Sequence, residues 1–324
     1  MAHHRNAISR FSRMILAALN SMICLAGCVS PALPEVRQSA WDPAPGLTGL
    51  RLETAHYDIH TTSNDPAMLD YLPVFMEATL AEYRKLIPVG IESAGKMQTY
   101  VFANRPQWAA FTKHFAPRQA HVYLHIKAGG YLDQSTGTTV IWDLGRDRTL
   151  SLLAHEGFHQ YLATYFTEPV VAWLNEGLAT QWESFDLDGP FPTFTPRRNY
   201  FRRNDLREAL MGENGWIPLD ELLSMHAGQA VVQTGQAVRG YYAQVWSLML
   251  FLRESPGGAY AGRLADLLAD AGTVRLETSG RAYRAATPSA GEISDGEAIF
   301  RYYVTDDLDA FEEAYKTFAR SLVD

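Results

Sequence analysis

The feature that most constrains the fold of this chain is a pair of histidines four residues apart, His155 and His159, with Glu156 directly after the first. Residues at this spacing lie one turn above each other on the same face of an α-helix. Both imidazoles can then reach one metal ion, and the glutamate can project toward the same cleft. We therefore predict a helix over Thr149–Phe166 that carries two metal ligands. By chance, an H-E-x-x-H pattern occurs roughly 0.02 times per chain of this histidine content.

A catalytic zinc ion needs a third protein ligand and one open coordination position. A second apolar segment, predicted to be helical from about Val171 to Phe185, contains Glu176 in the sequence Trp-Leu-Asn-Glu-Gly-Leu-Ala. The 16 residues between His159 and Glu176 are enough to finish one helix, turn and begin another antiparallel to it. Gly177 permits close helix approach. We predict a site of two imidazoles and one carboxylate.

These two segments together resemble the gluzincin clan of zinc peptidases, which includes thermolysin-like peptidases and zinc aminopeptidases, and are most similar to its peptidase-MA-like members. The resemblance covers roughly residues 95–255 and rests on H-E-x-x-H followed by W-L-N-E-G-x-A. It implies an α+β zincin fold in which Zn2+ is bound by His155, His159 and Glu176. It also implies hydrolysis of a peptide or protein substrate with Glu156 as the general base.

A third stretch, residues 242–248 with the sequence YAQVWSL, resembles the helix that carries the transition-state tyrosine of gluzincin aminopeptidases. This resemblance implies that Tyr242 donates a hydrogen bond to the oxyanion. Adjacent Tyr241 is the competing candidate, and packing of the Tyr242 ring in a core is the alternative without catalysis. The Gly-x-Met-Glu-Asn motif, with which those aminopeptidases hold the substrate's free amine, does not occur here. We therefore expect an endopeptidase rather than an exopeptidase.

Two further features could support the site. Glu183 lies two turns after Glu176 on the same predicted helix face, so its carboxylate either orients a ligating histidine or is solvated at the surface. Gly129, Gly130 and Tyr131 occupy the place where clan members bind peptide along a sheet edge. That segment is either an edge strand to which substrate adds or a plain hairpin turn.

Apolar periodicity divides the remaining chain into a small mixed sheet with helices over residues 51–146 and a helical part over 147–324, together one α+β catalytic domain. In the first part we predict strands over Leu52–Thr62, Met97–Ala103, His121–Ile126 and Thr138–Trp142, and helices over Pro66–Leu86 and Pro106–Phe115. In the second part we predict further helices over 204–211, 218–225, 241–254, 262–271 and 308–322. Residues 272–296, rich in Gly, Ser, Thr and charge, predict a loop.

The first 28 residues indicate export. Three arginines precede an apolar stretch that is too short to span a bilayer as a stable helix. The stretch ends in Leu-Ala-Gly-Cys28, which resembles the lipobox of bacterial lipoproteins. We expect residues 1–27 to be a signal peptide and Cys28 to carry a lipid anchor in the membrane of the cell envelope. By resemblance to Gram-negative lipoproteins, valine rather than aspartate at position 29 implies the outer membrane, facing the periplasm. The alternative is an ordinary secretory signal with an incidental cysteine.

The segment from Val29 to Gly49 contains four prolines among small residues and predicts an extended tether over residues 28–50. The formal net charge is −8, and no basic cluster stands out in the sequence. We therefore expect no nucleic-acid partner. The alternatives to a peptidase are a non-catalytic envelope lipoprotein that keeps the fold, and a zinc hydrolase of another amide or ester. Intact Glu156 argues against the first, because nothing structural requires a glutamate there.

Overall fold

The computed structural model describes the chain from residue 32 onward, except for residues 89–94, 128, 213–214, 226–234 and 288–292. Residues Pro34–Asp324 form one compact unit. The predicted signal peptide and Cys28 lie outside the described residues. None of the helices in the described ranges combines the length and the hydropathy that crossing a bilayer would require.

A six-stranded mixed sheet forms one part of this unit, with the spatial order β1-β2-β3-β4-β6-β5. The central strands β3, β4 and β6 run parallel, and antiparallel neighbours flank them on both sides. Every residue of β3 and β6 is buried, as expected for parallel strands covered on both faces. The strands are β1 Arg37–Ala44, β2 Leu47–Glu53, β3 Tyr57–Thr61, β4 Met97–Phe102, β5 Gly130–Asp133 and β6 Thr138–Trp142.

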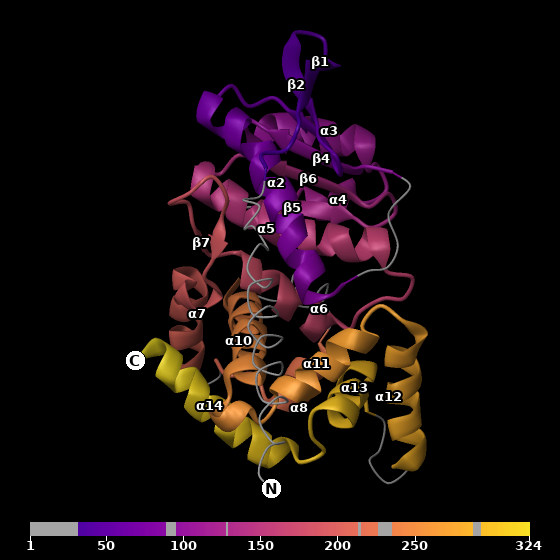
Figure 1. Cartoon of the computed structure of the whole chain (residues 1–324), viewed down its shortest axis with the longest axis vertical. Coiled ribbons are helices and arrows are strands. Elements are labelled where there is room, and N and C mark those ends of the chain that lie inside the picture. The colour runs from indigo at the N-terminus through magenta and orange to yellow at the C-terminus, as the bar shows by residue number, and fades with distance from the viewer. Residues whose placement is uncertain (1–31, 89–94, 128, 213–214, 226–234, 288–292) are drawn as a thin grey trace, which may run out of the picture. The chain divides into compact units, whose positions relative to one another are not determined.

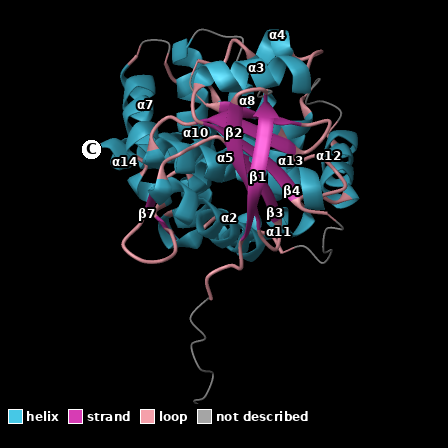
Figure 2. Cartoon of the chain, turned by 90° about the horizontal axis from the view of Figure 1, so that it is seen from above, coloured by secondary structure: helices cyan, strands magenta, loops and turns pink. Residues whose placement is uncertain are grey.

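Helices cover the two faces of the sheet (Figure 2). On one face, α2 (Pro66–Leu86) and α5 (Arg146–Tyr165) share a core with Ile59, Val101 and Ile141. On the other face, α3 (Arg105–Phe115) buries Trp108 against the alternate side chains of the same strands, such as Val140 and Trp142. The side chains of a strand alternate between its faces, so β4 and β6 contribute to both cores.

The sequence explains why α2 forms where it does. Asp65 caps its first turn by accepting a hydrogen bond from the Ala67 amide, and Pro66 occupies the first helical position, where its missing N–H costs nothing. Its last turn carries two basic residues, which favour the negative end of the helix dipole. The buried residues recur at helical spacing: Met68, Leu72, Phe75, Met76, Leu80 and Tyr83.

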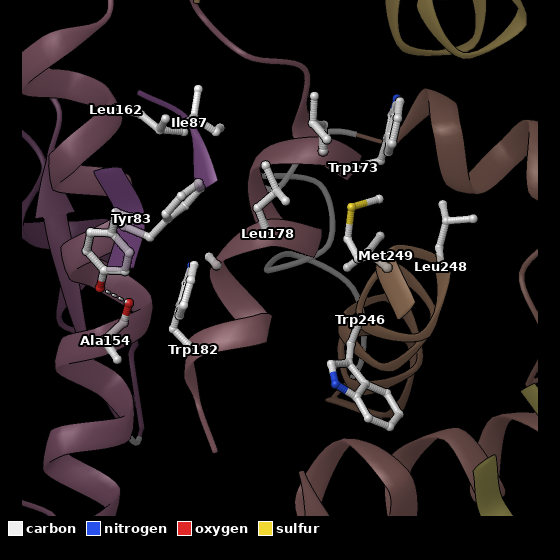
Figure 3. Packing of buried hydrophobic residues seen from close by; sticks show 14 of the residues in the cluster. Tyr83, Ile87, Ala154, Leu162, Trp173, Leu178, Trp182, Trp246, Leu248 and Met249 are labelled. Atoms are coloured by element: carbon white, nitrogen blue, oxygen red, sulfur yellow. Dashed lines mark hydrogen bonds between the residues drawn. The ribbon is translucent and has the colours of Figure 1, made fainter. Parts of the chain in front are cut away.

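Helix α5 is anchored from two sides. The Tyr83 hydroxyl on α2 donates a hydrogen bond to the Ala154 carbonyl at 2.5 Å (Figure 3). The fully buried Gln160 amide donates to the Gln98 and Gly137 carbonyls, at 2.7 and 2.8 Å. These bonds attach α5 both to its neighbouring helix and to the sheet.

The other part of the unit is helical and follows α5 in the chain (Figure 1). Helix α10 packs against both α6 and α7. The helices and the small hairpin of this part are α6 Ala172–Ala179, η1 Thr180–Trp182, β7 Phe185–Asp186, β8 Thr193–Phe194, η2 Pro196–Arg198, α7 Tyr200–Met211, α8 Leu219–Ser224, α10 Gly235–Glu254, η3 Pro256–Gly258, α11 Ala261–Asp270, α12 Val274–Ala286, α13 Asp295–Tyr303 and α14 Leu308–Val323. The predicted mixed α+β class is confirmed.

The predicted tether over residues 28–50 is wrong from residue 37 onward, where β1 and β2 pair as an antiparallel hairpin. Pro43 lies in β1 where the pairing register shifts, between Trp41 and Ala44. Since β1 is an edge strand, a residue without an N–H group is tolerated there. The prolines that suggested an isolated extended segment are compatible with a sheet edge.

Other secondary-structure predictions are also wrong. Residues 52–62 are not one strand, because β2 ends at Glu53, β3 begins at Tyr57, and the two pair antiparallel. Residues 121–126 do not form a strand, because the Val122 and Tyr123 amides bond to the Gln119 carbonyl and close the short helix α4 (Ala120–Tyr123). Residues 272–296 are not a loop throughout, because α12 occupies 274–286 and α13 begins at Asp295. Thr273 caps α12 by accepting from the Arg275 amide, and the charged residues that suggested a loop are mostly its exposed face.

Helices α6 and α10 approach each other closely at Gly177, and Figure 3 shows Leu178 of α6 beside Met249 of α10. A Cβ atom at Gly177 would lie 2.8 Å from Met249 Cγ and 3.0 Å from the Val245 carbonyl oxygen. Both contacts are shorter than van der Waals contact allows. Glycine is therefore required where α6 carries Glu176.

We expect Gly177→Ala to destabilise the protein, because overpacking costs about 1–3 kcal/mol and alanine's better helix propensity returns at most about 1 kcal/mol. Gly262→Ala in α11 is the matched control. No atom lies within 4 Å of a Cβ at that position, so only the gain in propensity remains. Urea unfolding of both variants measures the difference. A Gly177→Ala protein as stable as Gly262→Ala would contradict the close approach.

Candidate metal centre

Two histidines on α5 form one side of the candidate site. His155 and His159 lie one turn apart with their rings nearly perpendicular and their centroids 4.8 Å apart. The two Nε2 atoms approach to 3.1 Å. Helix α5 is bonded to α2 and to the sheet, and it also packs against α6, which carries Glu176.

Glu176 on α6 completes a triangle with these rings. Its Oε2 atom lies 3.3 Å from Nε2 of His155 and 3.3 Å from Nε2 of His159. Tetrahedral zinc with bonds of 2.0–2.1 Å holds its ligand atoms about 3.3 Å apart. The predicted convergence of His155, His159 and Glu176 is confirmed, and this buried group can hold a metal ion.

Hydrogen bonds behind the rings determine which nitrogens face the centre. Nδ1 of His155 lies 2.9 Å from Glu183 Oε1, and Nδ1 of His159 lies 2.8 Å from Asn175 Oδ1. Both oxygens are acceptors, so in the neutral rings each Nδ1 carries the proton and each Nε2 presents a lone pair. Glu176 Oε2 is buried and has no hydrogen-bond partner. Three lone-pair atoms this close repel one another unless a cation lies between them.

The pKa shifts of these side chains also indicate that the site favours positive charge. Burial lowers the pKa of His155, but the neighbouring Glu176 and Glu183 carboxylates outweigh this and raise the pKa to about 10. Burial raises the pKa of the Glu176 carboxyl, but the two histidines hold it far below its usual range. The site therefore favours positive charge, which protons supply when no metal is bound and which a divalent cation would replace.

Glu183 is buried behind His155 rather than solvated at the surface. Its Oε1 also accepts from Arg202 Nη2 at 2.5 Å, and its Oε2 accepts from Arg202 Nε and Asn199 Nδ2, both at 2.8 Å. Burial raises the pKa of this carboxyl, but the Arg202 charge and the His155 contact bring it down to about 2. Glu183 is therefore ionised and orients the His155 ring.

The three ligand residues lie in a cleft of about 2440 Å3 within the described part of the chain. Glu156 and Tyr242 line the same cleft, and the Tyr242 ring centroid is 6.0 Å from that of His155. Burial and the nearby Glu176 charge raise the pKa of Tyr242 well above its usual value, so its hydroxyl remains a donor. Tyr241 is fully buried and does not line the cleft.

The segment predicted as a substrate edge also borders the cleft. Gly129, Gly130 and Tyr131 line it, and β5 is the last strand of the sheet, paired with β6 alone. The reason for glycine at position 130 is packing, because a Cβ there would lie 2.3 Å from Ile141 Cγ2. Tyr131 is buried and donates a hydrogen bond to Thr112 Oγ1. The segment is thus an edge strand rather than a plain turn.

Another pair of histidines four residues apart, His121 and His125, is exposed on and after α4 and does not belong to the ligand triangle. Sequence reasoning missed Asn175, although its place directly before Glu176 was a usable signal. It also missed Arg202 and Asn199, for which no local signal exists because their partner Glu183 comes from another element.

Comparison with protein-family models, with curated proteins and with solved structures found no match to this chain. Function is therefore argued from the site. Within the described ranges, His155, His159 and Glu176 are the one group of three or more histidine, cysteine or acidic side chains with metal-binding spacing.

We expect the purified protein to bind about one zinc ion per chain and to gain thermal stability with added zinc, by mass action. Glu176→Gln keeps the size of the side chain but removes the charged ligand. It should lower zinc affinity by more than the roughly 10- to 100-fold loss typical of a residue behind a ligand. Glu168→Gln, a change at a cleft-lining carboxylate outside the triangle, should bind zinc normally. Chelator competition measures both, and equal affinities would exclude Glu176 as a ligand.

Proposed function

We propose that this protein is a zinc-dependent peptidase of the gluzincin type with a zincin fold. The observation that carries the proposal is that three ligand atoms, 3.1–3.3 Å apart, converge in a cleft also lined by a free carboxylate and a tyrosine. Structural zinc sites are closed by four protein ligands, whereas catalytic ones use three and leave a position open. The described residues offer three.

A zinc ion held by these residues would act as a Lewis acid that polarises a carbonyl oxygen and acidifies a water molecule. The remaining chemistry belongs to side chains of this chain. Glu156 is next to a ligand but outside the triangle, so its carboxylate is free to take a proton from the attacking water and deliver it to the leaving amine. Tyr242 is protonated and can donate a hydrogen bond to the developing oxyanion.

The substrate class follows from the shape of the site. The cleft of about 2440 Å3 exceeds the roughly 300–1,000 Å3 of typical small-molecule pockets. Its border includes the edge strand β5, to which an extended peptide could add through main-chain hydrogen bonds. We infer a peptide or protein substrate, cleaved internally, for an enzyme anchored through Cys28 in the cell envelope.

The second candidate function is a non-catalytic envelope lipoprotein that keeps the metal as a structural feature. Glu156 distinguishes the two, because it lines the cleft and contributes no atom to the ligand triangle. A third candidate, hydrolysis of another amide or an ester, would use the same residues and differ only in substrate.

We expect Glu156→Gln to retain zinc but to lose peptide hydrolysis by about 10²- to 10⁴-fold, the usual contribution of a general base. Asp147→Asn, at a cleft-lining carboxylate in the first turn of the same helix, should keep nearly full activity. A peptide library with mass-spectrometric readout measures cleavage, and metal analysis measures zinc.

Three results would separate the candidates. Wild-type protein that binds zinc but cleaves no member of the library favours the non-catalytic lipoprotein. Cleavage of ester or amide substrates alone favours the third candidate. Protein without any metal would defeat the peptidase proposal, because the proposed hydrolysis uses the metal as its Lewis acid.

The two tyrosines are distinguished by their exposure to the cleft. Tyr242→Phe should lower kcat by about 10²- to 10³-fold with little change in KM, as for loss of one oxyanion donor. Tyr241→Phe removes a buried hydroxyl that has no hydrogen-bond partner and should leave kcat nearly unchanged. The reverse order of effects would assign the oxyanion role to Tyr241.

A further inference from the structure

One arginine contacts both the support of a metal ligand and the candidate oxyanion donor. Arg202 binds Glu183 in a bidentate manner, at 2.5 and 2.8 Å, and Glu183 in turn orients His155. The same guanidinium carbon lies 4.9 Å from the centre of the Tyr242 ring, within the range of a cation–π contact. The carboxylate that supports His155 and the candidate oxyanion donor Tyr242 thus both contact one cation, which α7 supplies.

The carboxylate of Glu183 is fully occupied by this arrangement. Its two oxygens receive four hydrogen bonds, two from Arg202, one from Asn199 and one from His155. Arg202 is itself mostly buried, with 18% of its side chain exposed. A buried carboxylate that loses its cation becomes an unpaired charge, which is strongly unfavourable. The orientation of His155 therefore depends on Arg202.

The first turn of α7 holds the two donors in register. Asn199 caps the helix by accepting from the Arg202 amide at 3.2 Å, and its own amide group donates to Glu183. Arg202 and Asn199 therefore share one rigid turn, and they contact Glu183 as a unit. Helix α7 also packs along α10, which carries Tyr242.

We propose that Arg202 is a positioning residue that aligns His155, through Glu183, and the Tyr242 ring at the same time. The Tyr242 half of this inference rests on the proposed peptidase function, whereas the His155 half concerns metal binding alone. A guanidinium is needed rather than any cation, because only a planar fork can bind a carboxylate in a bidentate manner while its face covers an aromatic ring.

The test compares Arg202→Met and Arg202→Lys with the control Arg198→Met. Arg198 is an exposed arginine of the same cleft, paired with Asp186, so its loss controls for a change in net charge. We expect Arg202→Met to weaken zinc binding by about 10- to 100-fold, as for other residues behind metal ligands, and to lower kcat with little change in KM. Arg202→Lys should recover most of the zinc affinity but not kcat, because a point charge replaces the fork.

Chemical rescue adds a readout that a purely structural role would not give. Methylguanidinium added to Arg202→Ala should raise both zinc affinity and kcat, and should leave Arg198→Met unchanged. Circular dichroism checks folding. If Arg202→Met does not fold, the conservative Arg202→Lys variant and the rescue of Arg202→Ala still decide the inference.

Two patterns of outcome separate the inference from the proposed function. In the first pattern, Arg202→Met binds zinc more weakly but the wild-type protein cleaves no peptide. This pattern supports the His155 half of the inference and counts against the peptidase. If the wild-type enzyme is active, two further results together overturn the inference alone. Folded Arg202→Met would keep wild-type zinc affinity and kcat, and Arg202→Ala would not respond to methylguanidinium.

Discussion

The structure depends on one electrostatic constraint: three lone-pair atoms, from His155, His159 and Glu176, lie within 3.3 Å of one another in a mostly buried space. Such an arrangement is repulsive without a cation and strongly favourable with one. The protein must therefore supply packing and hydrogen bonds that hold the three side chains together. The surrounding helices and their hydrogen bonds hold the three side chains in this arrangement.

The three metal-site residues are held by two helices, α5 and α6, that are fixed in place by different contacts. Helix α5 is attached to α2 through Tyr83 and to the sheet through Gln160. These bonds fix the two histidines relative to the sheet. Helix α6 reaches its position because Gly177 lets it approach α10. The polar partners Glu183 and Asn175 then determine which nitrogen of each ring faces the centre.

A further helix, α7, contributes contacts to the side chains around the site. Helix α7 brings Arg202 against both Glu183 and Tyr242, so the ligand support and the candidate donor share one cation. The edge strand β5 borders the same cleft. The three metal-site residues, Glu156, Tyr242 and the strand edge therefore come from four elements that are separate in the chain: α5, α6, α10 and β5.

By itself, the sequence determined those features whose physical causes are local. Helical periodicity located α2, α5 and α14, and the spacing of His155, His159 and Glu176 identified the three side chains that converge. The tertiary structure alone decided the rest. Residues 37–44 became an edge strand because β2 lies beside them and pairs with them, and Arg202 is paired with a carboxylate 19 residues earlier in the chain. Pairing partners and buried ion pairs are long-range contacts, and neither the composition of a segment nor its periodicity carries information about what will lie beside it.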